Sequence, residues 1–199
     1  MSELGSRLRT TLHEYRETFA NGDVRAISRR YFIANGFDMT LTSIGITVGA
    51  FLSGVTTGAT VVKVGLGAGI GLTTSAVWSV WEVERAEKQA ELHHVENAML
   101  TDLSRTELAV HNDRARKINA VMSGLGPIVG LLPITPYLLV GIVFSMVSAT
   151  VASVSIGVGT LFVFGAYMGS ISKQRWYTAG LRMGVAGIFV ALLNLLLPG

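Results

Sequence analysis

A run of 55 residues without a charged or histidine side chain, from Ile118 to Ser172, is the feature that most constrains this fold. About 20 apolar residues in a helix already cross the hydrocarbon core of a bilayer. Only 15% of the 199 residues are charged and half are apolar, whereas an ordinary soluble domain has about 25% charged residues. We therefore expect an integral membrane protein.

Five apolar segments have the length of membrane spans, at about residues 31–53, 58–81, 118–138, 140–168 and 183–197. Each should be helical, because backbone groups in hydrocarbon need hydrogen-bond partners within their own segment. The alternation typical of β-barrel strands is absent. The fifth segment is short, so residues 177–182 are expected to extend it. The fold class predicted is all-α, a polytopic membrane protein with five transmembrane helices.

The basic residues predict how these spans are oriented. Of the 16 Lys and Arg residues, 15 fall on one side of the predicted membrane, and the remaining one is Lys63 inside the second span. Basic residues favour the cytoplasmic side, which places the N-terminus in the cytoplasm and the C-terminus outside. If the chain is prokaryotic, the membrane is the cell membrane. The chain then has four regions: a cytoplasmic amphipathic helix (1–30), spans one and two (31–81), an acidic cytoplasmic hairpin (82–117) and spans three to five (118–199).

The N-terminal region has apolar residues at helical spacing, with arginines between them; these apolar residues are Leu4, Leu8, Leu12, Tyr15 and Phe19. Such a helix either lies on the cytoplasmic leaflet or packs on its own protein. The basic flanks favour the leaflet, so membrane lipid is an expected partner.

The hairpin concentrates acidic residues on two predicted helices. At 100° per residue, Glu84, Glu87 and Glu91 share one face with His94. Glu107 and His111 are four residues apart on the second helix. Carboxylates and imidazoles on facing helices can bind a divalent metal such as Fe²⁺ or Mn²⁺. The alternative is a solvated charged hairpin with ion pairs such as Glu84–Lys88.

Asp38 lies about two turns inside the first predicted span. A carboxylate at the centre of a bilayer costs about 2.5–3.5 kcal/mol on insertion scales, and such residues usually mark an ion or proton path. Asn35 and Met39 flank it within one turn and could add an oxygen or a sulfur ligand. The alternative for Asp38 is a structural ion pair with Lys63. The alternative for Met39 is a lipid-facing or core residue.

Several classes of function are not indicated. The chain has no cysteine, which excludes disulfides, iron–sulfur clusters and thiol catalysis. No phosphate-binding loop, zinc-protease motif or nucleophile elbow occurs, so we expect no enzyme and no tightly bound cofactor. The net charge of +3 is too small to indicate a nucleic-acid partner.

Two stretches resemble the vacuolar iron transporter family: Arg30-Tyr-Phe-Ile-Ala-Asn-Gly-Phe-Asp38 opening the first span, and Gly126-Pro-Ile-Val-Gly-Leu-Leu-Pro-Ile-Thr-Pro-Tyr137 in the third. The resemblance implies a homodimer that exchanges cytoplasmic Fe²⁺ or Mn²⁺ for protons along the first span. Asp38 falls at the family's intramembrane aspartate, and the hairpin glutamates fall on its cytoplasmic carboxylates. The chain departs from the family at Tyr31, where an acidic residue is usual, and at Met39, where glycine is usual.

The function predicted is therefore a proton-coupled transporter of a divalent transition metal. The alternative is a non-transporting scaffold or assembly subunit, whose charged hairpin docks a soluble partner. A third possibility is a metal sensor, which would bind metal at the hairpin without transport.

Overall fold

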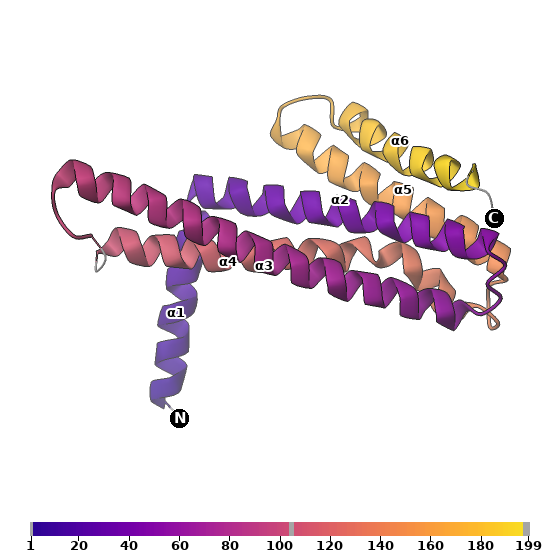
Figure 1. Cartoon of the computed structure of the whole chain (residues 1–199), viewed down its shortest axis with the longest axis horizontal. Coiled ribbons are helices and arrows are strands. Elements are labelled where there is room, and N and C mark those ends of the chain that lie inside the picture. Colours follow the sequence, from indigo (N-terminus) through magenta and orange to yellow (C-terminus); the bar gives the residue numbers. More distant parts are fainter. Residues whose placement is uncertain (1, 104–105, 197–199) are drawn as a thin grey trace. The chain divides into compact units, whose positions relative to one another are not determined.

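The computed structural model describes residues 2–103 and 106–196, and nearly all of this part of the chain is helical (Figure 1). The elements are α1 (Ser2–Ala20), α2 (Gly22–Leu52), α3 (Gly58–Met99), α4 (Glu107–Gly130), the 3-10 helix η1 (Leu132–Leu139), α5 (Met146–Ile171) and α6 (Trp176–Leu195). Across these ranges there is no β-strand beyond an isolated bridge between Val140 and Phe144. The all-α prediction is confirmed.

The chain divides into two compact units. Unit 1 comprises Met1–Phe32 and Thr74–Gly124, and unit 2 comprises Ile33–Thr73 and Leu125–Gly199. Unit 1 therefore contains α1 and the predicted cytoplasmic hairpin, whereas unit 2 contains η1, α5 and α6.

Four helical segments in the described residues are long and apolar enough to cross a membrane: Gly58–Met99, Glu107–Leu139, Met146–Ile171 and Trp176–Leu195. The first predicted span is also helical, as part of α2, but α2 is not among these four. Polar residues lower its hydropathy, and several of them are buried, including Thr40, Ser43 and Thr47. The count of five spans therefore stays a prediction.

Two predicted helices have the extent that the sequence indicated. The second predicted span continues without a break into the first helix of the predicted hairpin, because α3 runs from Gly58 to Met99. The sixth helix begins at Trp176, so residues 177–182 do extend the fifth predicted span.

One predicted helix start was wrong. The fourth span was expected from residue 140, but α5 begins at Met146, after a turn in which Gly141 has a φ of +87°. The Ser145 hydroxyl accepts a hydrogen bond from the Ser148 backbone N–H and caps the helix. The N-terminal region predicted over residues 1–30 contains a helix break, since α1 stops at Ala20 and α2 starts at Gly22.

The prolines of the third predicted span change its helical geometry. Pro127 lies inside α4, while Pro133 and Pro136 are buried in η1. Proline donates no backbone hydrogen bond, so two prolines three residues apart interrupt the α-helical pattern and leave a 3-10 helix. Unit 2 therefore has a non-α-helical segment with one buried face, formed by Pro133, Ile134, Pro136 and Tyr137. Burial of such backbone in protein is what the hydrocarbon region of a membrane requires.

Buried hydroxyls connect the elements of unit 2. The Ser43 hydroxyl of α2 donates to the carbonyl oxygen of Gly130 at 2.8 Å. The Tyr137 hydroxyl of η1 donates to the carbonyl oxygen of Thr47 at 3.2 Å and lies 2.7 Å from the Thr150 hydroxyl. These bonds satisfy polar groups that would otherwise be buried at a cost.

Candidate functional site

The Asp38 side chain is exposed on the surface of α2. Lys63 of α3, the partner considered from the sequence, is exposed as well, and among the described residues no ion pair joins the two. The structural ion pair is therefore absent from this arrangement of unit 2. The carboxylate is directed away from the packed interior.

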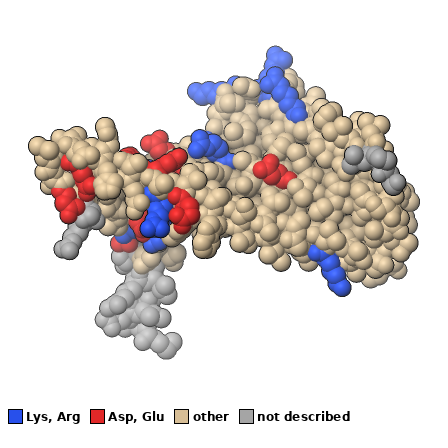
Figure 2. All heavy atoms as spheres, viewed as in Figure 1, with Lys and Arg blue, Asp and Glu red and all other residues tan. Residues whose placement is uncertain are grey.

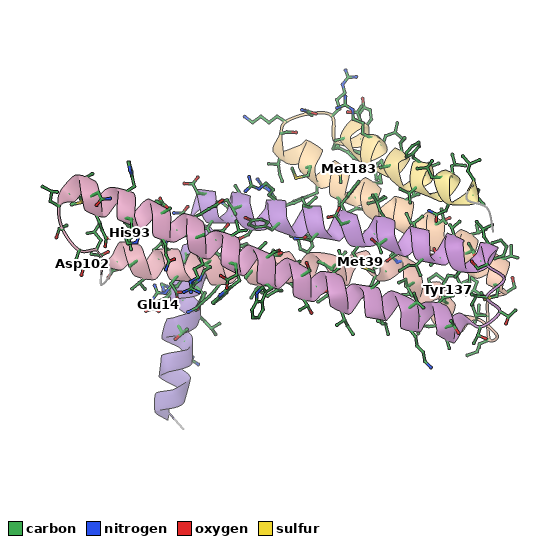
Figure 3. The ribbon with its side chains drawn as sticks, in the orientation of Figure 1. Glu14, Met39, His93, Asp102, Tyr137 and Met183 are labelled. Carbon is green, nitrogen blue, oxygen red and sulfur yellow. The ribbon has the colours of Figure 1, made fainter. Side chains whose placement is uncertain are left out.

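Asn35 and Met39 differ in their surroundings, although both flank Asp38. Met39 is fully buried and lies against Gly130 of α4 (Figure 3). Asn35 is half-buried. The burial of Met39 favours the core alternative for its side chain, and its role as a ligand stays a prediction.

The predicted metal ligands of the hairpin occupy different environments in unit 1. Glu84 is buried, with 2% of its surface exposed, whereas Glu87, Glu91 and Glu107 are exposed and His111 is half-buried. Over the described ranges, no group of three or more His, Asp or Glu side chains is close enough to hold a metal ion. Metal binding by these residues stays a prediction.

The hairpin instead contains several local ion pairs, and Figure 2 shows acidic and basic side chains intermingled over it. Lys88 Nζ lies 2.8 Å from Glu91 Oε2, so Lys88 pairs with Glu91 and not with Glu84 as the spacing had suggested. Asp113 Oδ2 lies 2.6 Å from Lys117 Nζ. His93 Nδ1 lies 3.0 Å from Glu96 Oε2. These contacts match the alternative of a solvated charged hairpin for the exposed carboxylates.

Glu84 has a different partner, which the sequence pattern did not indicate. The Tyr31 hydroxyl of α2 donates a hydrogen bond to its carboxylate. Nearby in the sequence, the Ser28 hydroxyl donates to Asn119 Oδ1 of α4 at 2.6 Å, and both side chains are buried. Helical spacing alone does not indicate either of these two contacts, because each joins residues that are far apart in the sequence.

An ion pair joins the first helix, α1, to α4 within unit 1. Arg114 of α4 donates to Glu14 Oε2 at 2.7 Å (Figure 3). Leu12 and Phe19 nevertheless stay 68% and 38% exposed, which favours the leaflet alternative for this helix. The side chains of Leu4 and Leu8, part of the same predicted apolar face, lie outside the described residues.

Two comparisons with known proteins bear on this arrangement. The VIT family model matches residues 79–197, which include the hairpin and the last three predicted spans but not Asp38. An uncharacterized protein of Methanocaldococcus jannaschii is 26% identical over 168 residues, covering 82% of this chain and 85% of that protein. No solved structure matches the chain.

The family match overlaps one of the two motifs that carry the resemblance. The resemblance in residues 30–38 lies before the matched segment, and the one in residues 126–137 lies within it. Because the family model covers more than half of the chain, and because both motifs agree with it, this membrane protein belongs to the VIT family.

Proposed function

We propose that the protein is a homodimeric transporter that moves Fe²⁺, with Mn²⁺ as the second candidate, out of the cytoplasm in exchange for protons. Membership of the VIT family supports a membrane metal-ion transporter rather than an enzyme. The placement of 15 basic residues on one side supports a cytoplasmic N-terminus and an external C-terminus.

The observation that carries this proposal is the exposed carboxylate of Asp38. At membrane depth, an ionised carboxylate facing lipid is unfavourable by about 2.5–3.5 kcal/mol. Asp38 therefore needs a water-filled path, a second copy of the chain or a bound cation beside it. A dimer with this part of α2 at its centre provides all three, and Asn35 is close enough in sequence to contribute an oxygen ligand.

The same carboxylate gives the exchange its physical basis. A metal ligand must be deprotonated, so protons and metal compete for Asp38. At the cytoplasmic end, Glu84, Glu87, Glu91, Glu107 and His111 would load the metal. In the described residues one copy assembles no group of three such ligands, so loading would need a second copy or a rearranged hairpin.

The first test is uptake of Fe²⁺ and Mn²⁺ into proteoliposomes containing the purified protein, with lumenal pH recorded. We expect metal entry matched by proton movement in the opposite direction. Asp38→Asn should abolish this flux and leave the oligomeric state unchanged, since the amide keeps the shape of the side chain but loses the charge.

Asp23→Asn is the matched control, because Asp23 is an exposed acidic residue in the first turn of the same helix, before the predicted span. Its flux should equal that of the unmodified protein. Normal flux in Asp38→Asn would refute the role of Asp38. Absence of flux with either metal in a folded dimer, reconstituted in both orientations, would contradict transport of these ions and favour the scaffold alternative.

A further inference from the structure

A cavity of about 100 Å³ lies in the hairpin part of unit 1, lined by residues of both α3 and α4. Its polar lining consists of Arg85, Lys88 and Gln89 from α3 and Asn112, Asp113 and Arg116 from α4. None of these six belongs to the predicted metal ligands. The lining is therefore distinct from the predicted ligand set, although Lys88 contacts one of those ligands, Glu91, at 2.8 Å.

Two residues of this lining have buried hydrogen-bond donors without an acceptor. They are Asn112 Nδ2 and Arg116 Nε. Asn112 is only 7% exposed, so water reaches its amide poorly. A buried donor without a partner costs about 1–3 kcal/mol, and native proteins seldom retain one without a reason. Both groups are donors, so the ligand that would satisfy them is an acceptor.

The charged residues that line the cavity are mostly basic. Its lining has three basic residues and one acidic residue, Asp113, whose oxygens are already bound by Arg116 and Lys117. Each of the other two basic residues pairs with an acidic side chain outside the lining, since Glu91 lies 2.8 Å from Lys88 and Glu82 lies 4.0 Å from Arg85. A bound anion would compete with these two half-exposed carboxylates for the basic groups. Arg85 is half exposed and its contact with Glu82 is long, so a bound anion would compete for its guanidinium.

The volume and the donor types select the anion further. About 100 Å³ exceeds the roughly 30 Å³ of a water molecule and suits a small tetrahedral group. Guanidinium donors match the oxygens of a phosphate in pairs. Phosphate offers at least three acceptor oxygens, enough for one guanidinium, one ammonium and one amide at the same time.

The position along α3 and α4 fits a phosphate close to the membrane surface. The Arg116 guanidinium stacks 4.2 Å from the ring centroid of Trp81, the residue at which the second predicted span ends. Tryptophan is enriched at the level of lipid headgroups. The cavity residues Arg85 and Lys88 come after Trp81 within two helical turns, so a headgroup phosphate and a phosphate dissolved in the cytoplasm both have access.

We infer that this cavity, formed by Arg85, Lys88, Asn112 and Arg116, is a binding site for a phosphate group, borne either by an anionic phospholipid or by free inorganic phosphate. Arg85 and Lys88 supply charge from α3, while Asn112 and Arg116 supply the buried donors from α4. A phosphate bound in this cavity links α3 and α4 through one anion.

Two arms of one experiment distinguish the sources of phosphate. In the first, native mass spectrometry of the full chain counts bound phosphatidylglycerol against phosphatidylcholine. In the second, calorimetry measures binding of inorganic phosphate in neutral detergent. Arg85→Gln with Lys88→Gln should weaken binding about tenfold or more in the arm that reports the natural source, because two charge-assisted hydrogen bonds are lost.

The matched control is Lys173→Gln with Arg175→Gln, which removes two exposed basic residues from the loop between α5 and α6. Asn112→Leu is the second test variant, since it removes the buried donor at similar volume and leaves the surface charge intact. It should lose binding as well and, without ligand, should unfold at an equal or higher temperature.

Loss of binding in both test variants, with the control unchanged, supports the site, and the arm that shows it identifies the source. Three results overturn the inference: no binding in either arm, binding that neither test variant weakens, or an equal loss in the control pair. The last result would show that general attraction to basic residues explains the binding.

Discussion

Glu84 is a buried carboxylate whose identified hydrogen-bond donor, Tyr31, comes from another helix. Burying an ionised carboxylate is tolerated only when hydrogen bonds replace its hydration. Tyr31 occupies the position where the vacuolar iron transporters usually have an acidic residue. A second carboxylate there would place two like charges together, so a phenol is the simpler partner for Glu84.

Tyr31→Phe should destabilise the protein by about 1–3 kcal/mol, because the carboxylate loses its donor and stays buried. The midpoint of thermal unfolding in detergent measures the loss. Tyr167→Phe is the control, since Tyr167 is 49% exposed on α5 and should change little. Equal midpoints for the two variants would show that the Tyr31–Glu84 hydrogen bond adds no stability.

Residues at this scale were only partly predictable from the sequence. The cost of a charge at membrane depth singled out Asp38, and that reasoning needs no knowledge of neighbouring helices. Whether Glu84 is buried depends on which helix covers that face of α3, and helical spacing alone gives no such information. For this reason Glu84 was grouped with the exposed Glu87 and Glu91, although the structure gives it a different environment.

At the scale of elements, α5 and α6 pack through glycine. A β-carbon built on Gly165 would lie 2.4 Å from the carbonyl oxygen of Ala179, closer than real contacts allow. A β-carbon on Gly159, also in α5, would have nothing within 4 Å. Gly165 is therefore a contact point between two backbones, as small residues often are between membrane helices.

Gly165→Ala should lower stability by about 1–3 kcal/mol through overpacking, whereas Gly159→Ala should be neutral or slightly stabilising because alanine favours the helix. Thermal unfolding of both variants in the same detergent gives the comparison. A Gly165→Ala protein as stable as Gly159→Ala would mean that α5 and α6 are less closely packed than the structure indicates.

The prediction of elements succeeded where the pattern was local. No glycine or proline occurs between Thr73 and Asp113, and α3 indeed continues past the predicted membrane boundary. The start of α5 was misplaced because residues 140–145 are nearly all apolar, so hydropathy does not distinguish that turn from a helix. The turn signals, Gly141 and Ser145, are present in the sequence but are inconspicuous in an apolar run.

At the scale of the whole molecule, the number of spans decides on which side each terminus lies. Five spans place the two termini on opposite sides, and four spans place them on the same side. The chain has no cysteine, so single cysteines introduced at exposed positions test this on a clean background.

In intact cells, an impermeant maleimide should label Thr56→Cys, between α2 and α3, and should leave Gln174→Cys and Ala20→Cys unlabelled until the membrane is permeabilised. All three positions are exposed in the structure. The expected result comes from the placement of the basic residues. Labelling of Ala20→Cys together with Thr56→Cys would show that α2 does not cross the membrane.

The stacking of Arg116 on Trp81 has an optical consequence. The chain has three tryptophans, and the other two, Trp78 and Trp176, are 70% and 55% exposed. Replacing those two with phenylalanine would leave a single indole, in contact with a cation that lines the hairpin cavity. Its fluorescence would then respond to any event that moves Arg116, and the protein would serve as its own unlabelled sensor.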